Sequence, residues 1–210
     1  MRRVAWIMCG GPSASEKLSV SGDIIAVNKD MFRYSEEAKY TITMDNRFTV
    51  WELSNPQRET PKTSTNIFIV NMADENMRHT KSFYDARWGI SYDLSQYDMI
   101  VKSYGVHGFG ETWKDFRNGG NSGYCALQLA LLLGYNEIHL IGMDLGKVNG
   151  LTHHHEGYPE CKDDYDGRFT EFSLAIMTAI TNDLEKFSGV TLINHSPVSP
   201  LRSLIGYEPV

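Results

Sequence analysis

The sequence has few cysteines, no excess of positive charge and no long apolar run. Its three cysteines, Cys9, Cys125 and Cys161, are a sparse and odd set, which favours a reduced, cytoplasmic protein over a disulfide-stabilised one. Lysine and arginine number 20 against 26 aspartates and glutamates, and the formal net charge of −6 argues against a nucleic-acid surface. The longest apolar run, near 127–133, is too short to cross a bilayer, and no signal peptide is evident.

Repeats, low-complexity tracts and two common nucleotide motifs are also missing. The chain has neither the spaced glycines of a dinucleotide fingerprint nor the Gly-Lys-Ser/Thr of a Walker A loop. These absences count against an ordinary NAD enzyme and a P-loop nucleotidase. Hydrophobic and charged contents of 41% and 22% are ordinary, and 210 residues predict one domain covering 1–210. Nothing in the sequence opposes a homo-oligomer.

Short apolar runs recur along the chain and predict a sheet. They cover 4–9, 23–28, 40–45, 65–71, 98–103, 137–144 and 190–195. The first run is continuous rather than alternating, which is typical of a strand covered on both faces. Apolar residues at steps of three and four between 169 and 187 predict a long helix. We therefore predict an α/β protein with a Rossmann-like, mostly parallel sheet, helices on both faces and a lid-like loop at 146–166. The segments 51–64, 74–96 and 104–118 are predicted to be irregular.

The stretch 119–144 is the most informative part of the chain. It opens with five small residues, Gly119, Gly120, Asn121, Ser122 and Gly123, and continues as an apolar run from Tyr124 to Leu133. Gly134 closes the run, where a helix would need a left-handed residue. The unpaired N–H groups and the dipole at a helix N-terminus bind anions, so we expect a phosphate or carboxylate at this turn. A plain tight turn before a core helix is the alternative.

Polar residues follow several of the predicted strands. Gly10, Gly11, Pro12 and Ser13 follow the first, Asn28 ends the second, Asp45 ends the third and Asp144 ends the sixth. Turn chemistry explains any one of them alone. The carboxyl ends of parallel strands, however, lie along one edge of a sheet, where ligands bind. The set predicts a ligand site at that edge.

Three consecutive histidines, His153, His154 and His155, lie in the loop that follows the predicted strand 137–144. In an extended loop, His153 and His155 share one side and His154 points the other way. An imidazole is suited to remove a proton at neutral pH, and imidazoles with carboxylates also bind divalent metals. Three interpretations stay open: a catalytic base or ligand contact, a metal site, or a solvated loop.

The order of these motifs resembles one superfamily of nucleotide-using proteins. The residues that carry the resemblance are 11–13, Asn28, Asp45, 119–123, 133–145 and 152–153. The superfamily includes archaeal 6-hydroxymethylpterin diphosphokinases, motility accessory proteins thought to glycosylate flagellin, and bacterial lipo-oligosaccharide sialyltransferases. The resemblance implies a Rossmann-like fold that binds an activated nucleotide. It places Ser13, Asn28, Asp45 and Ser122 around the nucleotide or its phosphates.

The sequence departs from the sialyltransferase branch after Asp144. Those enzymes carry a tyrosine just after the acid and a histidine before the last long helix. Here Gly146 takes the first position, and 162–168 contain no histidine. The pattern from Asp144 to His153 is closer to the other two branches, which counts against sialyl transfer itself.

The function predicted from these residues is group transfer from a nucleotide-activated small molecule, foremost a CMP-type nucleotide sugar. The turns at 10–13 and 119–123 would hold the donor phosphates, and His153 or His155 would act as base. Asp45 or Asp144 would orient the acceptor or bind Mg²⁺. One alternative is an ATP-dependent diphosphokinase with Mg²⁺ on these two acids. A nucleotide-sensing protein without activity is the other.

Overall fold

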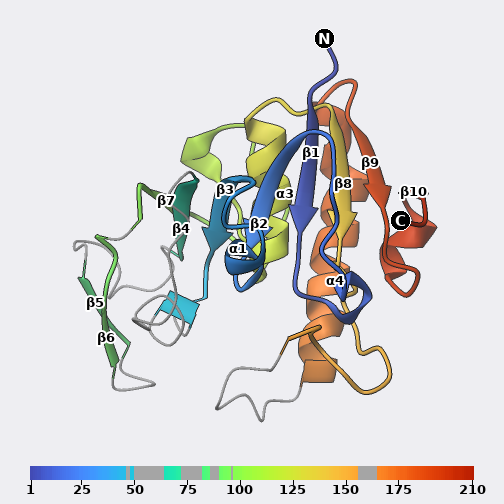
Figure 1. Ribbon diagram of the computed structural model, residues 1–210. Helices are drawn as coiled ribbons and strands as arrows, with labels where there is room; N and C mark the ends of the chain where they lie inside the picture. Colours follow the sequence, from blue (N-terminus) through green and yellow to red (C-terminus); the bar gives the residue numbers. More distant parts are fainter. Residues whose placement is uncertain (46–47, 50–63, 72–81, 86–89, 96, 156–164) are drawn as a thin grey trace.

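The computed structural model describes residues 1–45, 48–49, 64–71, 82–85, 90–95, 97–155 and 165–210. A single eight-stranded sheet, ordered β10-β9-β8-β1-β2-β3-β4-β7, forms its centre (Figure 1). All its pairings are parallel. The strands are β1 Val4–Met8, β2 Asp23–Val27, β3 Ala38–Thr43, β4 Thr65–Asn71, β7 Met99–Ser103, β8 Glu137–Ile141, β9 Thr191–Asn194 and β10 Gly206–Tyr207. The predicted α/β, Rossmann-like class is confirmed.

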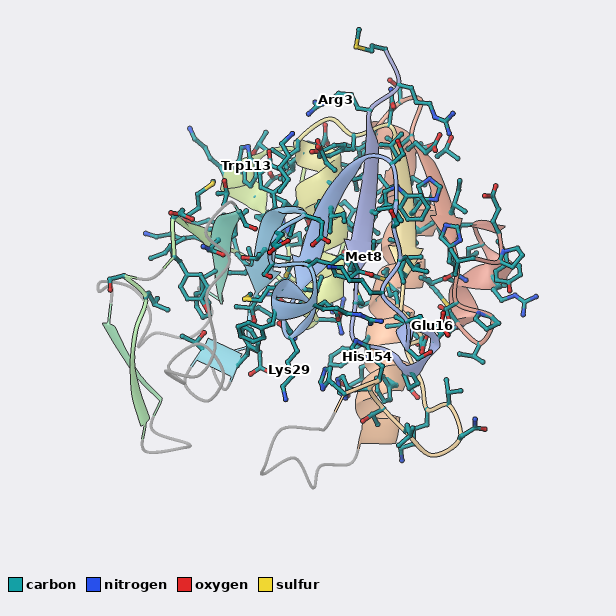
Figure 2. All side chains as sticks on the ribbon, in the orientation of Figure 1. Arg3, Met8, Glu16, Lys29, Trp113 and His154 are labelled. Carbon is teal, nitrogen blue, oxygen red and sulfur yellow. The ribbon has the colours of Figure 1, made fainter. Side chains whose placement is uncertain are left out.

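The order of the strands reverses beside β1. From β1 the chain adds β2, β3, β4 and β7 on one side, and then returns to add β8, β9 and β10 on the other. The loops after β1 and β8 therefore leave the sheet in opposite directions and open a crevice between them, which is where open α/β sheets bind ligands. Figure 2 shows His154 and Lys29 at this carboxyl end of the strands, with Arg3 and Trp113 at the opposite end.

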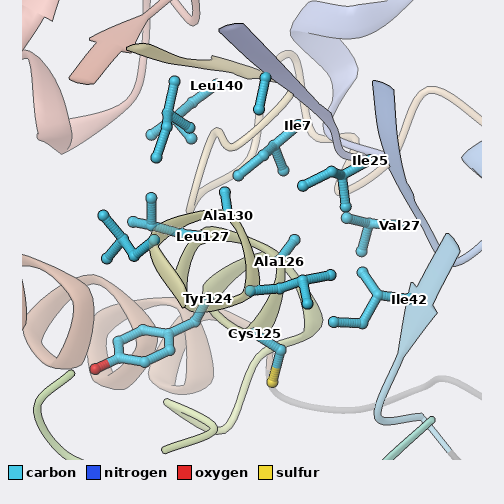
Figure 3. Close-up of a cluster of buried hydrophobic side chains, with 14 of the residues drawn as sticks. Ile7, Ile25, Val27, Ile42, Tyr124, Cys125, Ala126, Leu127, Ala130 and Leu140 are labelled. Atoms are coloured by element: carbon cyan, nitrogen blue, oxygen red, sulfur yellow. The ribbon is translucent and has the colours of Figure 1, made fainter. Parts of the chain in front are cut away.

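Two long helices cover one face of the sheet, α3 (Ser122–Leu132) and α4 (Tyr165–Asp183). Figure 3 shows α3 against the strands: Leu127 and Ala130 face Ile7, Ile25 and Leu140 in one buried cluster. The other face is covered by the short helix α1 (Asp30–Arg33) and by apolar side chains of the segment between β1 and β2. Helices thus lie on both faces, as predicted. No described helix is long and apolar enough to cross a membrane.

The ends of α3 are fixed by its sequence. The Asn121 side chain accepts a hydrogen bond from the Tyr124 N–H at 3.1 Å, as an N-cap does. Gly134 takes the predicted left-handed conformation, with φ of 77°. The Tyr135 N–H then reaches the Ala130 carbonyl at 3.1 Å, which ends the helix in a Schellman motif.

Some elements lie outside what the sequence predicted. Part of the segment 74–96, predicted to be irregular, forms an antiparallel pair of strands, β5 (Ser82–Asp85) and β6 (Ile90–Asp93). The edge strand β10 was also missed, because two residues give no pattern. Single 3₁₀ turns occupy Pro12–Ala14 (η1), Trp113–Asp115 (η4), Leu184–Lys186 (η5) and Pro200–Ser203 (η6). The segment 51–64 lies outside the described residues except for Ser64.

Candidate functional site

A hollow lies at the crevice beside β1, and we call it the crevice site. Its walls come from the loops after β1, β2 and β8, the N-terminus of α3 and Phe169 of α4. The segment Thr152–His155, which we call the histidine loop, completes them. The predicted residues that line it are Gly10, Gly11, Asn28, Asn121, Ser122, Gly123, Asp144, His153 and His155. The topology therefore brings most of the predicted site residues together.

The loops after β1 and β8 approach each other too closely for side chains. The Gly11 N–H donates to the Gly142 carbonyl at 3.0 Å. A Cβ on Gly11 would lie 2.3 Å from that same carbonyl oxygen, and one on Gly142 would lie 2.1 Å from the Cys9 oxygen. Only glycine fits at these two positions. The two glycines bring the backbone of the turn after β1, residues 10–13, against the end of β8.

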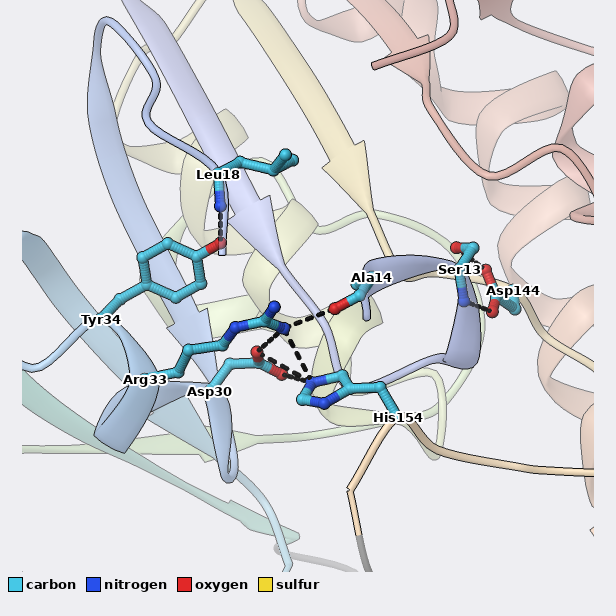
Figure 4. A network of polar contacts seen from close by, with 8 residues as sticks. All are labelled: Ser13, Ala14, Leu18, Asp30, Arg33, Tyr34, Asp144 and His154. Carbon is cyan, nitrogen blue, oxygen red and sulfur yellow. Dashed lines mark hydrogen bonds and ion pairs between the residues drawn. The ribbon is translucent and has the colours of Figure 1, made fainter. Parts of the chain in front are cut away.

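Asp144 ties these two loops together. It is 3% exposed, and one carboxylate oxygen accepts the Ser13 N–H at 2.8 Å while the other accepts the Ser13 hydroxyl (Figure 4). Both oxygens are thus engaged within the protein. This geometry fits a role in shaping the first turn better than the predicted role in catalysis or metal binding.

The N-terminus of α3 faces the crevice site. Asn121, Ser122 and Gly123 line the site, and Ser122 is 7% exposed. The Ser122 hydroxyl accepts the Met44 N–H at 3.1 Å, which anchors the end of β3 to the helix. An anion in the site would meet the positive end of the helix dipole, as the sequence predicts.

Asn28 leaves β2 in the left-handed region, with φ of 52°. Asparagine tolerates this conformation better than most residues. Its Oδ1 atom is buried and has no hydrogen-bond partner among the described residues, although the side chain lines the crevice site. A buried acceptor without a donor is costly, so this oxygen is suited to a donor group on a ligand.

The histidine loop folds over the site with alternating directions. His153 and His155 line the site and stack on each other, with ring centroids 4.8 Å apart. His154 does not line the site: its ring meets the His155 ring edge-on, and its Nε2 lies 3.1 Å from Asp30 Oδ1 and 3.3 Å from Arg33 Nη1 (Figure 4). The predicted sharing of one side by His153 and His155 is confirmed. Asp30 and Arg33 of α1, which were not predicted as site residues, hold the loop in place.

The environment of His153 keeps its imidazole neutral. Burial first, and then the neighbouring His155 and His154, lower the pKa of His153 to about 4. The Thr152 hydroxyl lies 3.0 Å from its Nδ1 atom. At neutral pH the ring therefore has a lone pair with which to accept a proton. A bound anion would favour the protonated ring and raise this pKa toward the neutral range.

Four predicted nucleotide-binding residues are not among those that line the crevice site. Pro12 and Ser13 lie in η1, where Ser13 turns to Asp144. Asp45 follows β3, and its N–H donates to the Thr43 hydroxyl at 3.0 Å. Gly120 lines a second hollow, on the other side of the α3 turn. Thr152 and Phe169 also line the site, and neither was predicted as a site residue.

The donor set fits a metal ion poorly. In the described part of the chain, no three histidine, cysteine, aspartate or glutamate side chains gather as metal ligands do. Asp144 is engaged by Ser13, and Asp45 does not line the site. Cys9 lines the site, but burial raises the pKa of its thiol well above the usual value, which leaves it a weak nucleophile. We therefore derive no chemical step through a metal or a thiolate.

The crevice site is small. Its volume is about 100 Å³, whereas sites for drug-sized molecules span roughly 300 to 1,000 Å³. The described walls therefore enclose a phosphate-sized group and not a whole nucleotide sugar.

Comparisons with known proteins agree with the fold. No protein-family model and no curated protein matches the chain. The sialyltransferase CST-II, solved as a single-residue variant in complex with CMP, aligns with 100% of this chain and 87% of its own, at 19% identity and a TM-score of 0.53. CstII from Campylobacter jejuni in complex with cytidine-5'-monophosphate aligns over 99% and 85%, at 18% identity and a TM-score of 0.50. The predicted likeness to the sialyltransferase branch is thus supported as a likeness of fold. The likeness to the other two branches stays a prediction.

Proposed function

We propose that the protein transfers a sugar from a nucleotide-activated donor, of the CMP-sugar type, to a hydroxyl group of an acceptor. The observation that carries this proposal is the pair His153 and His155, stacked in the same hollow as the N-terminus of α3. An anion site beside a neutral base is what such a transfer needs. The similar folds solved with CMP support the choice of nucleotide.

The proposed reaction uses the two halves of the crevice site differently. The donor phosphate lies against the N–H groups at the start of α3 and beside the turn at Gly10 and Gly11, whose Gly11 N–H is already bonded to the Gly142 carbonyl. His153 or His155 takes the proton of the acceptor hydroxyl as its oxygen bonds to the anomeric carbon. The bond from that carbon to the phosphate oxygen breaks, and the nucleotide monophosphate leaves with the electron pair. The helix dipole stabilises the charge on this leaving group.

The anionic donor also prepares the base. A ring with a pKa of about 4 is neutral but weakly basic. A phosphate in the same hollow would raise that pKa, so the imidazole becomes a stronger base only when the donor is bound. Donor binding and proton removal are coupled in this way.

The first experiment asks which nucleotide binds and whether turnover follows. CMP-sugars, UDP-sugars, ATP, GTP and CTP are compared by thermal shift, since a ligand at 100 times its Kd stabilises by about 2.7 kcal/mol. We expect CMP-sugars to give the largest shift. Replacing both His153 and His155 with alanine should lower turnover of the donor by about a hundredfold or more while nucleotide Kd changes little.

The matched control is Leu151→Ala, an exposed position in the same loop, which should behave as the wild type. Equal turnover in the double histidine variant and the wild type would contradict the proposal. Turnover of ATP that stops in EDTA would favour the diphosphokinase instead. Tight nucleotide binding without turnover of any donor would favour a sensor.

A further inference from the structure

Of the three histidines in the histidine loop, His154 is the one that does not line the crevice site. Its Nε2 atom lies 3.1 Å from Oδ1 and 3.4 Å from Oδ2 of Asp30, so it faces both carboxylate oxygens (Figure 4). Its backbone N–H donates to the Gly10 carbonyl at 3.0 Å. His154 is therefore attached to the rest of the protein through both its ring and its backbone.

The carboxylate of Asp30 is buried and has a second partner on its own helix. Asp30 is 1% exposed, and Arg33, one turn later in α1, places Nη1 3.7 Å from its Oδ1. The same Nη1 donates to the Ala14 carbonyl. Removing one partner of a buried charge is costly, because the other partners do not replace the lost contact. The contact with His154 thus stabilises Asp30 as well as the loop.

The neighbours of Nε2 decide where His154 carries a hydrogen. This atom lies between a carboxylate oxygen of Asp30 and, at 3.3 Å, Nη1 of Arg33. A guanidinium only donates hydrogen bonds and a carboxylate only accepts them. A hydrogen on Nε2 therefore bonds to Asp30, while Arg33 bonds to Ala14 and faces the carboxylate. Nε2 of His154 then has no lone pair that could accept a proton from a substrate.

The other two histidines lie over the turn after β1. The rings of His153 and His155 both come within 3.4 Å of the place that a Cβ on Gly10 would occupy. Successive residues of an extended segment point to opposite sides, so a shift by one residue would exchange the two sets of positions. His154 would then enter the site and the other two would leave it. Because all three residues are histidine, the sequence of the loop does not select one arrangement.

The turn that carries Asp30 also carries Asn28, which lines the crevice site. The Met31 N–H donates to the Asn28 carbonyl at 3.0 Å, and the Phe32 N–H donates to the Lys29 carbonyl at 3.1 Å. These bonds fix the backbone of the turn. The same short segment therefore lines the site and holds the loop that carries the proposed base.

We propose that Asp30 is a positioning residue for the transfer: it accepts the Nε2–H of His154 and thereby keeps His153 and His155 facing the donor. This inference rests on the proposed function, and it adds a residue outside the site that decides which histidines act. His154 supplies a hydrogen-bond donor to Asp30 and takes no part in the proton transfer.

The first test compares two substitutions of His154, assayed with the CMP-sugar that gives the largest thermal shift. In His154→Gln the side-chain amide can still donate to Asp30, whereas His154→Ala has no donor. We expect His154→Gln to keep most of the wild-type kcat. His154→Ala should lose about tenfold or more, because a hydrogen bond to a charged group changes an equilibrium by roughly ten- to a hundredfold. The Kd of CMP should be equal in all three proteins. Equal losses of kcat in the two variants would overturn the proposal.

The second test removes the acceptor instead of the donor. Asp30→Ala should lower kcat about tenfold or more at unchanged Kd for CMP, and Asp30→Asn, which keeps an acceptor oxygen, should lose less. Asp23→Ala is the matched control at the other end of β2. It loses contacts of 2.7 Å to Lys39 and 2.5 Å to Tyr135, so it should lower stability and leave kcat unchanged.

Two results of the second test would contradict the positioning role. One is a wild-type kcat in Asp30→Ala, and the other is an equal loss of kcat in the Asp23→Ala control. Should Asp30→Ala fail to fold by circular dichroism, Asp30→Asn and the two His154 variants still decide the question, because each of them keeps a polar side chain at position 30.

Nitrogen-15 NMR of the histidine rings separates this proposal from the proposed function. In the wild type we expect His154 to carry a hydrogen at Nε2 and its signals to stay unchanged when CMP is added, while those of His153 and His155 shift. In Asp30→Ala the His154 signals should shift as well. A wild-type His154 that responds to CMP like its neighbours would overturn the proposal. If no CMP-sugar turns over, the proposed function fails, and the Nε2–H of His154, present in the wild type and lost in Asp30→Ala, still decides whether Asp30 fixes the loop.

Discussion

At the scale of single residues, Asn28 combines a backbone requirement with an unmet polar group. Its backbone is left-handed, the residue lines the crevice site, and its Oδ1 is buried without a partner among the described residues. Asn149 takes a similar conformation, with φ of 51°, on an exposed loop. The two asparagines therefore separate the effect of the backbone from the effect of the side-chain oxygen.

Asn28→Gly removes the side-chain oxygen and keeps the left-handed backbone accessible. We expect the Kd of the bound nucleotide to rise about tenfold, because a lost hydrogen bond costs about 1 to 1.5 kcal/mol. Calorimetric titration with CMP measures the change. Asn149→Gly should leave the Kd unchanged, and an unchanged Kd in both variants would remove Asn28 from the binding site.

At the scale of elements, the site depends on the close approach of the loops that follow β1 and β8. The strands pair in register along their whole lengths, so their following turns meet at Gly11 and Gly142. Gly10, one residue earlier, meets a different neighbour. A Cβ on Gly10 would lie 3.0 Å from His155 Nε2, the end of a flexible side chain.

Gly11→Ala and Gly10→Ala are predicted to differ in their effects: the first should lower stability, and the second should mainly lower turnover. The alanine at Gly11 must displace the Gly142 carbonyl, just after β8, and the Asp144 side chain, so we expect a loss of roughly 3 kcal/mol or more of unfolding free energy. The alanine at Gly10 only displaces His155, so stability should fall by less than about 1 kcal/mol while turnover falls. Urea denaturation gives the free energies. Similar losses in the two variants would contradict the close approach.

At the scale of the whole molecule, buried histidines connect stability to pH. The pKa of His153 falls to about 4, and burial also lowers the pKa of His195. Between pH 6.5 and 4, a histidine of the unfolded chain binds a proton. In the folded chain, His153 stays neutral over the same range. The contribution of these histidines to the free energy of unfolding therefore decreases as pH falls through this window and is constant above it.

For His153 alone, the expected loss between pH 7.5 and pH 5 is about 2 kcal/mol, since one pKa unit corresponds to about 1.4 kcal/mol. His153→Gln removes the titrating group and should flatten this part of the pH profile. Urea midpoints at several pH values measure it. A variant whose profile keeps the slope of the wild type would show that other groups cause the loss.

The sequence by itself determined seven strands of the eight-stranded sheet, the helix α3 and the alternation of the histidines. These follow from local causes: continuous apolar runs, an asparagine N-cap with Gly134 at the other end, and the period of two of an extended loop. It also placed the polar residues at one edge of the sheet, because parallel strands share their carboxyl ends. Local patterns do not predict which residues far apart in the sequence come into contact.

Only the tertiary structure decided which of those residues share a site. The position of β8 beside β1 turned Asp144 toward Ser13 and left Asp45 outside the lining, although both acids end a strand. It also brought Asp30 to His154, a contact between residues 124 positions apart. Such contacts are set by the order of strands in the sheet, and this order depends on packing across the whole core. No local pattern in the chain encodes it.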